Sequence, residues 1–313
     1  MSTAVLTPPK ARTPNFGRYA WGVLAWNVLV VLWGAFVRAS GSGAGCGSHW
    51  PLCNGAVVPR APRLETIIEF THRLMSGAAL VAAAGLLVWS VRLFPRGHRV
   101  RKAAIASFAF LIVEALLGAG LVLFQFVAGD ASVGRAVYLS LHLVNTQFLL
   151  AMLALTAWFS IQPERSYGRW PRLPMATLPL AILVSVSGAI AALGDTLFPA
   201  SSLSEGFRQD LSSGGHFLLR LRIIHPALAI FSAAFFVAVA LWMLRGRPPA
   251  AMKRIALSVL VLTLAQLCAG AINIALLAPI GMQIFHLLLA DLVWIALVLM
   301  AVEAAARGQA PVK

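Results

Sequence analysis

The stretch Glu-Phe-Thr-His-Arg at residues 69–73 stands at the start of the second long apolar segment of this chain. It places a carboxylate, an imidazole and a guanidinium within about one helical turn, where we expect the chain to enter hydrocarbon. Histidines recur near the starts of three later apolar segments, at His142, His225 and His286. Because ionisable side chains are costly inside a membrane, four imidazoles in equivalent places indicate a function.

The composition is that of an integral membrane protein. Of 313 residues, 60% are hydrophobic and only 11% are charged, which is too few charges to solvate a soluble surface. Apolar runs long enough to cross a bilayer recur along the chain. The predicted fold class is therefore an all-α integral membrane protein with eight transmembrane helices, at about 19–40, 67–91, 103–127, 137–161, 175–193, 218–244, 255–277 and 282–305.

The positions of Lys and Arg predict the orientation of these spans. Most of the 25 cations lie in the two terminal segments and in alternate links between spans. The positive-inside rule places that side, with both termini, in the cytoplasm, and we expect the membrane to be the bacterial cytoplasmic (inner) membrane. The links expected to face outward are 41–66, 128–136, 194–217 and 278–281.

The charge distribution also argues against two other interpretations. The formal net charge of +15 does not indicate nucleic-acid binding, because the cations occupy short links and no soluble segment is long enough for a continuous basic face. The first apolar run is too long for the core of a signal peptide, so we expect it to be a retained membrane anchor.

The two halves of the chain resemble each other. Gly34-Ala-Phe corresponds to Gly188-Ala-Ile, and Glu114 and Gly118 correspond to Gln266 and Gly270 at nearly the same offset. Four spans per half leave both halves in one orientation, which predicts two parallel pseudo-repeated bundles. The predicted domains are a cytoplasmic tail (1–18), a four-helix bundle (19–161) with the outer loop 41–66, a cytoplasmic linker (162–174), a second four-helix bundle (175–305) and a cytoplasmic tail (306–313).

The four histidines are candidate heme ligands. His72, His142, His225 and His286 all lie in the first third of spans that run from outside to inside, so their imidazoles share one depth. Two imidazoles that face each other across a bundle are suitable axial ligands of heme iron. The alternatives are an ordinary interface position for each ring and a zinc site, but no second His or Cys lies at metal-ligand spacing on these spans.

Glu69 distinguishes the two candidate sites. It precedes His72 by three residues and therefore projects from the same helical face, where it can orient the imidazole or accept a proton. Its alternative role is that of an interfacial residue that reaches toward water. The corresponding stretch of the second half ends in His225-Pro226 and has no acid, so we expect chemistry in the first half and electron storage in the second.

Arginines and cysteines gather on the outer side of the predicted membrane. Guanidinium groups pair well with carboxylates, and they are candidate partners of heme propionates, although interfacial anchoring explains them equally well. Cys46 and Cys53 frame an outer loop, where an oxidising compartment favours a disulfide; a metal site that also uses His49 is the alternative. The candidate arginines are Arg38, Arg73, Arg220 and Arg222.

Three further polar residues lie inside predicted spans. Glu114 and Asp291 can belong to a proton route or form interhelical hydrogen bonds, and the sequence does not decide between these roles. Cys268 is expected to be an inert core residue.

Taken together, these residues resemble the heme A synthase family, whose members oxidise heme O to heme A for cytochrome oxidase. The resemblance covers all eight predicted spans. It depends on Val37-Arg38-Ala-Ser-Gly-Ser-Gly, the outer loop from Cys46 through Trp50-Pro51-Leu52-Cys53-Asn-Gly55, the stretch 69–73, and the histidines at 142, 225 and 286.

The resemblance implies a function for each candidate residue. His225 and His286 would hold a resident heme b, His72 and His142 would bind heme O as substrate, Glu69 would be catalytic, and Cys46–Cys53 would form an outer-loop disulfide. Heme O synthase and cytochrome oxidase assembly factors are the expected partners beside the lipid bilayer, and the electron acceptor is not specified. Two departures from the family are Pro226 after His225 and a glutamate at position 114, where glutamine is more usual.

Two other functions stay open at this point. A di-heme, quinol-linked b-type cytochrome would use the same ligands, although such proteins commonly place two histidines on one helix. A heme or solute transporter would suit a parallel repeat, but transporters tend to have broken helices at mid-membrane, whereas the polar residues here gather at one edge.

Overall fold

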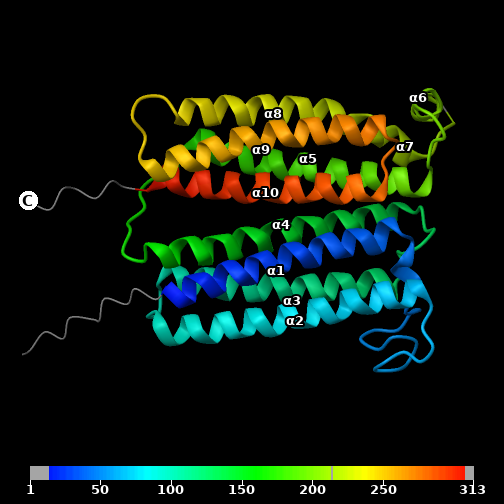
Figure 1. The fold of residues 1–313 in the computed structure, drawn as a ribbon, viewed down its shortest axis with the longest axis horizontal. Coiled ribbons are helices and arrows are strands. Elements are labelled where there is room, and N and C mark those ends of the chain that lie inside the picture. Colours follow the sequence, from blue (N-terminus) through cyan, green and yellow to red (C-terminus); the bar gives the residue numbers. More distant parts are fainter. Residues whose placement is uncertain (1–13, 213, 307–313) are drawn as a thin grey trace, which may run out of the picture.

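The computed structural model describes residues 14–212 and 214–306, which are mainly helical (Figure 1). Eight helical spans are long and apolar enough to cross a membrane, so the predicted all-α fold with eight spans is confirmed. Residues 1–13 and 307–313 of the predicted tails lie outside the described residues. The spans are α1 (Pro14–Ala39), α2 (Leu64–Leu93), α3 (Arg99–Leu123), α4 (Val133–Ile161), α5 (Arg172–Leu197), α7 with α8 (Phe217–Arg222 and Ile224–Met243), α9 (Ala250–Ala275) and α10 (Ile280–Ala305).

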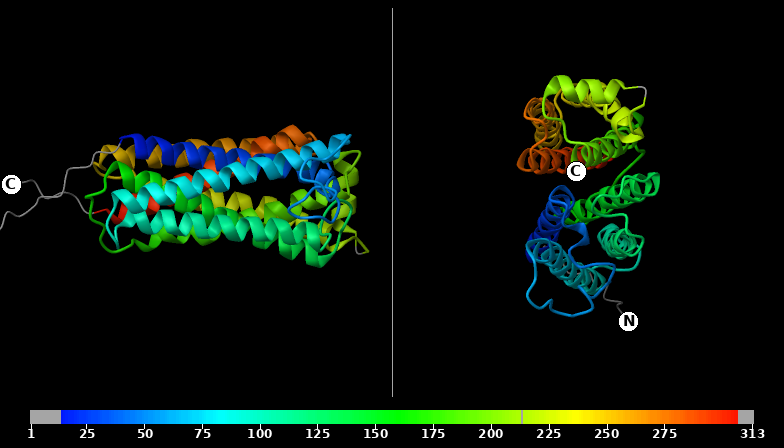
Figure 2. Two further views of the ribbon diagram at one scale, coloured as in Figure 1. Left: turned by 90° about the horizontal axis from the view of Figure 1, so that it is seen from below. Right: turned by 90° about the vertical axis from the view of Figure 1, so that its right-hand side faces the viewer.

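The spans form two groups of four helices that lie side by side (Figures 1 and 2). In the first group α1 contacts α2, α2 contacts α3, α3 contacts α4, and α4 returns to α1. In the second group α5, α8, α9 and α10 contact one another in the same cyclic order. This matches the arrangement expected of two bundles, whereas the internal repeat of the sequence stays a prediction.

The core of the protein lies where the two groups meet. Helix α10 contacts α1 and α4, and α4 also contacts α5. Accordingly α4 and α10 are the most buried of the eight spans. On α10 the residues from Val293 to Val302 are all buried, because this helix packs against both groups. The central helices are thus shielded from lipid, and the remaining spans present one side outward.

One span is interrupted, and the sequence explains where. Helix α7 ends at Arg222 and α8 begins at Ile224. Pro226 has no backbone N–H, so it cannot bond to the carbonyl of Arg222, and its ring disfavours a continuous helix there. The break, at Ile223, lies two residues before His225. The polar segment ahead of it forms a short helix that the sequence analysis did not predict, α6 (Leu203–Leu211).

Successive spans alternate in direction, so the starts of α2, α4, α8 and α10 gather at one end of the molecule (Figure 1). We call this the histidine end, because all four candidate histidines lie within the first third of their spans. The first described turn of α1 and the last turn of α10 lie at the opposite end (Figure 1). The links at the histidine end include the loop from residue 40 to residue 63, with the short 3-10 helix Ser42–Ala44, and α6.

Candidate heme sites

The second group brings two of the candidate histidines face to face. The ring centroids of His225 on α8 and His286 on α10 are 6.5 Å apart, and the ring planes are nearly perpendicular at 84°. A metal bound to one nitrogen of each ring at about 2 Å, a normal distance for imidazole nitrogen, leaves the centroids roughly 6 Å apart. The observed separation therefore fits one metal ion between the two rings.

Each ring of this pair has a different polar neighbour. The Nδ1 atom of His225 lies 3.0 Å from the hydroxyl oxygen of Ser187 on α5. His286 Nδ1 is buried without a hydrogen-bond partner among the described residues, while its Nε2 lies 3.2 Å from the side-chain amide of Gln266. Only His225 thus has a hydrogen-bonding partner that leaves its Nε2 free to face a ligand.

In the first group His72 on α2 and His142 on α4 are within electrostatic range of each other. The Nδ1 atom of His142 lies 2.9 Å from Oε1 of Glu114 on α3. The Nδ1 atom of His72 is buried without a partner among the described residues. Both rings are partly buried. Like the pair in the second group, this pair has one ring whose Nδ1 meets a polar side chain and one ring whose buried Nδ1 has no partner among the described residues.

A glycine on a neighbouring helix lies against each of the four rings. A Cβ atom added to Gly34 or Gly270 would lie 3.0 Å from the ring of His72 or His286, and one added to Gly188 would lie 2.9 Å from the ring of His225. At Gly118 the same atom would lie 3.6 Å from His142, an ordinary contact. In the sequence these glycines are matching positions of the two halves, and only the structure shows that they make room for the histidines.

The histidine pairs fit a metal that carries its own equatorial ligands. Among the described residues no group of three or more His, Cys, Asp or Glu side chains is arranged to hold a metal ion alone. A heme iron needs only two axial ligands from the protein. The facing rings of the second group, and in both groups the unpartnered buried nitrogens and the glycine contacts, are what two imidazole ligands of a flat macrocycle require.

Glu69 lies under the outer loop and is almost fully buried, with 4% of its surface exposed. Its Oε2 accepts a hydrogen bond of 2.8 Å from the backbone N–H of Cys46. Its Oε1 pairs with Arg73 at 2.5 Å, one helical turn further along α2. Arg73 in turn donates to the carbonyl oxygens of His49 and Leu52, at 2.8 Å each. The two side chains therefore fasten the outer loop to α2.

The predicted disulfide is present. Cys46 and Cys53 are joined by a bond of 2.00 Å, so the alternative metal site with His49 is wrong, because its two thiolates are not free. The free Cys268 is exposed on α9, which corrects the prediction that it lies in the core. A helix in a membrane can present a small apolar side chain to lipid, and the sequence gives no direct sign of this.

Arg38 on α1 reaches out of its own group. Its guanidinium donates to the carbonyl of Ala192 at 2.8 Å and to the hydroxyl of Thr196 at 2.7 Å. A third bond of 3.0 Å goes to the side chain of Gln283 on α10. This arginine therefore joins the two groups at the histidine end, and all three partners belong to the second group.

Arg222 is held by two carboxylates. Its guanidinium lies 2.9 Å from Asp195 on α5 and 2.5 Å from Asp210 on α6. These ion pairs favour a structural role, which fixes α6 and α7 against α5, over the predicted contact with a propionate. Arg220, on the same short helix, also has an interaction partner.

Asp291 lies in the central helix α10 and is completely buried. Neither of its carboxyl oxygens has a hydrogen-bond partner among the described residues. Its role stays open, as it was from the sequence.

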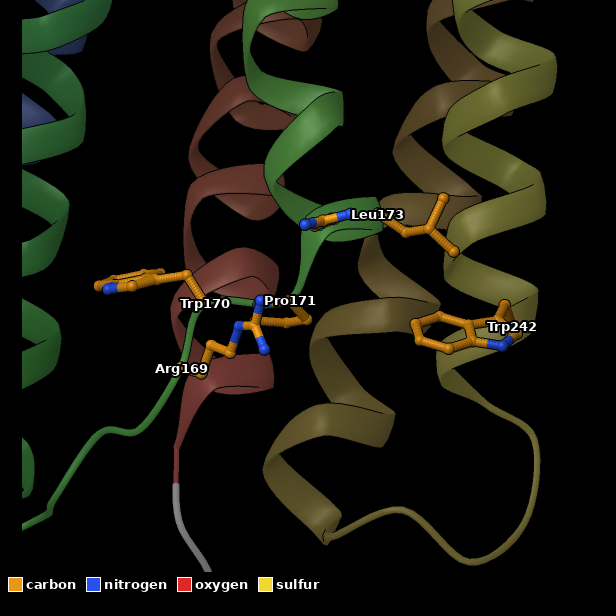
Figure 3. Close-up of a pocket in the computed structure, with 6 residues that line it drawn as sticks. Arg169, Trp170, Pro171, Leu173 and Trp242 are labelled. Atoms are coloured by element: carbon orange, nitrogen blue, oxygen red, sulfur yellow. The ribbon is translucent and has the colours of Figure 1, made fainter.

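A pocket of about 510 Å³ lies at the opposite end of the molecule, between the start of α5 and the end of α8 (Figure 3). It is therefore remote from the histidines and does not belong to the candidate heme sites. Its lining residues are Arg169, Trp170, Pro171, Arg172, Leu173 and Trp242.

Comparison with known proteins places this architecture in a family. A family model described as a cytochrome oxidase assembly protein (COX15-CtaA) matches residues 17–298. Proteins named heme A synthase from Bacillus cereus and Bacillus anthracis are 39% identical over 118 residues, which is 38% of this chain and 37% of theirs.

Two proteins from Thermus thermophilus strains, named protoheme IX farnesyltransferase, are 48% identical over 305 residues. The match covers 95% of this chain and 50% of each relative. The chain thus spans about half the length of these relatives, and the activity in their name describes a protein twice as long as the shared part.

Proposed function

The chain belongs to the COX15-CtaA family of cytochrome oxidase assembly proteins, which includes heme A synthases, and on this premise we propose that it oxidises heme O to heme A. The observation that carries the proposal is the 6.5 Å separation of the His225 and His286 rings. It supports a resident heme b in the second group. The first group would bind heme O through His72 and His142.

The chemistry required is a four-electron oxidation of a methyl group to a formyl group, R–CH3 + H2O → R–CHO + 4 H+ + 4 e−, so water supplies the oxygen atom and the four electrons leave to an acceptor outside the chain. A bound heme b supplies a reversible one-electron carrier. The protein has to hold the substrate by its two imidazoles, exclude side reactions and take up protons. Helices α1 to α4 provide the first of these functions, because each imidazole lies against a glycine of the preceding helix.

Glu69 is the proposed proton acceptor. It is the carboxylate nearest to His72 in sequence, and its two oxygens are held by Arg73 at 2.5 Å and by the Cys46 N–H at 2.8 Å. Contact with the substrate would require one of these bonds to be exchanged. The second group offers no acid at the corresponding position, which supports chemistry in the first group only.

Among the arginines at the histidine end, Arg38, Arg73, Arg220 and Arg222 are the proposed partners of the heme propionates. Arg38 is best placed for the second group, because it already contacts α5 and α10. Arg220 is the next candidate there. Arg73 and Arg222 are engaged by carboxylates and would have to share their donors.

We also propose a bacterial cytoplasmic membrane location with the histidine end outward, following the distribution of Lys and Arg. The substrate must be supplied by a farnesylation of protoheme. The Thermus relatives bear the name of such an enzyme and have a further half that this chain does not match. A protoheme farnesyltransferase is therefore the proposed partner, together with cytochrome oxidase assembly factors.

The test is to extract the hemes of the purified protein, identify them by chromatography, and then supply heme O together with an excess of a chemical electron acceptor. We expect heme b together with heme O or heme A, and conversion of added heme O to the formyl product. The Glu69→Gln variant should keep its heme content and lose the conversion, whereas the exposed matched control Glu65→Gln should keep both. Full conversion by Glu69→Gln would remove Glu69 from the mechanism.

A second candidate activity is protoheme farnesylation, because of the 48% identity over nearly the whole chain. The same preparation supplied with protoheme and farnesyl diphosphate tests it. Formation of heme O without any formyl product would overturn the proposed oxidation. A protein that holds two hemes b, exchanges electrons with quinol and yields neither product would instead be an electron-transfer cytochrome.

A further inference from the structure

A carboxyl group contacts one candidate ligand of the first group directly. Glu114 Oε1 lies 2.9 Å from His142 Nδ1. The other oxygen, Oε2, accepts a bond of 2.5 Å from the side-chain amide of Asn145, and the hydroxyl of Thr146 also contacts Glu114. Asn145 and Thr146 are buried residues of α4, so the carboxyl group is held from three sides against the helix that carries His142.

The second group has a neutral counterpart at the matching place. Gln266 stands four residues before Gly270, as Glu114 stands four residues before Gly118. The Gln266 side chain lies 3.2 Å from Nε2 of His286, not from its Nδ1. The two residues that follow His286 at the spacing of Asn145 and Thr146 are Leu289 and Ala290, which cannot hold a carboxyl group in place.

This difference changes what the two imidazoles can do as ligands. A carboxyl oxygen at Nδ1 keeps the proton on that nitrogen, so Nε2 is left with its lone pair toward a metal. It also increases the electron donation of the ring, as carboxylate–histidine pairs do in metal sites. Stronger donation stabilises ferric over ferrous iron and lowers the reduction potential. Among the described residues His286 has only the neutral side chain of Gln266 beside one ring nitrogen and no carboxylate beside either, so it receives no such assistance.

We propose that Glu114 is a positioning residue for His142, which makes the first-group heme harder to reduce than the second-group heme. The inference rests on the proposed function, since it takes the two histidine pairs as heme ligands. With this order of potentials, electrons removed from the substrate site flow toward the second group. The purely structural alternative is that Glu114 only links α3 to α4 through Asn145 and Thr146.

The experiment isolates each site and measures its potential. His225→Ala leaves the first-group site, and His72→Ala leaves the second-group site. Each protein is loaded with hemin and titrated electrochemically while its absorption spectrum is recorded. In the His225→Ala background, Glu114→Gln should shift the midpoint potential upward and weaken hemin binding about 10-fold. Glu65→Gln, an exposed residue of α2, is the matched control and should leave both unchanged.

The reciprocal variant tests the same idea without disturbing Glu114. In the His72→Ala background, Gln266→Glu would replace the neutral amide beside Nε2 of His286 with a carboxylate, and with iron on the other ring nitrogen, Nδ1, it should shift the second-group potential downward. If Glu114→Gln fails to accumulate in the membrane, the reciprocal variant decides alone.

The outcomes separate this inference from the function on which it rests. A wild-type protein that binds no hemin at either histidine pair ends the proposed function. The inference would be wrong if both hemes bind normally but neither Glu114→Gln nor Gln266→Glu shifts the midpoint potential of its site. The proposed function would be unaffected by that result. A Glu114→Gln protein with lower thermal stability and an unchanged potential would assign Glu114 to helix packing alone.

Discussion

The two groups of helices share a scaffold and differ in how they hold their histidines. In the first group His142 is fixed by Glu114, and the Nδ1 of its partner His72 has no hydrogen bond among the described residues. In the second group His225 is fixed by Ser187 and the Nδ1 of His286 has none. One ring of each pair is held through its Nδ1, but on opposite members. The difference teaches that the scaffold sets where imidazoles stand, while single polar residues set their chemistry.

The loops at the histidine end differ in the same way. In the first group Arg73 and Glu69 bind the disulfide-closed loop to α2 through backbone groups. In the second group Arg222 binds the short helices α6 and α7 to α5 through two carboxylates. One link depends mainly on hydrogen bonds to the backbone and the other on paired charges.

Removal of a ligand should have the largest effect and should separate the two groups. The protein with His142→Ala is expected to lose the heme of the first group and to keep that of the second. The protein with His286→Ala should do the reverse, because in each case one iron loses an axial ligand. Heme-to-protein ratios from pyridine hemochrome spectra, with identification of the retained heme, measure this. Loss of both hemes from either variant would show that the sites are not independent.

Substitution of the glycines should have a graded effect. In Gly188→Ala the new methyl group would lie 2.9 Å from the ring of His225, and overpacking of about 1–3 kcal/mol should weaken hemin binding about 5- to 150-fold. In Gly118→Ala the methyl group would lie 3.6 Å from His142, so binding should change little. Hemin titration of both proteins measures the difference. Equal losses would mean that small size matters at these positions for helix packing and not for the rings.

The two arginine links should differ in stability. Arg222→Gln leaves two neighbouring carboxylates without their cation, and we expect a loss of about 3 kcal/mol in the free energy of unfolding. Arg73→Gln leaves Glu69 with its bond to the Cys46 N–H, and we expect about 1–2 kcal/mol. Denaturation of the two proteins in mixed micelles compares them. The reverse order would mean that the loop of the first group contributes more to the fold than the ion pairs of the second.

The smallest effect is expected from a substitution next to α6. Among the described residues this short helix has no counterpart in the first group. Hydrogen bonds from the hydroxyl and the backbone N–H of Ser201 lower the pKa of the exposed Glu205 carboxyl group. A carboxyl group whose pKa is lower in the folded than in the unfolded protein stabilises the fold at pH values above its unfolded pKa. This stabilisation is lost as the pH falls through the folded-state pKa. Ser201→Ala should raise the pKa of Glu205 without affecting heme content. A carbon-13 NMR titration measures it, and an unchanged pKa would show that the hydroxyl does not bind in solution.

Much of the architecture followed from the sequence. The length of the apolar runs predicted all eight spans, with ends that differ from the structure by a few residues, because hydrocarbon thickness fixes how much chain must be apolar. The break at Ile223 could have been predicted from Pro226. Helix α6 was missed, because a short amphipathic helix leaves little periodic signal between polar turns.

The contacts of the site were less predictable. Arg38 and Arg73 were both expected near propionates, yet one joins the two groups and the other holds a loop. The position of a residue along its span places it at the histidine end. It does not say which neighbour its side chain meets, since that depends on the rotation of each helix and on loops far away in sequence.

The sequence by itself thus determined the number of spans, the shared level of the four histidines and the asymmetry of Glu69, because each depends only on the order of residues along apolar segments. Tertiary structure alone decided that His225 faces His286 at 6.5 Å, that Glu114 meets His142, and that Gly34, Gly188 and Gly270 make room for imidazoles. These depend on how closely the helices approach and how they are rotated, and in a membrane that approach is set by side-chain packing between helices, which the sequence of one segment does not contain.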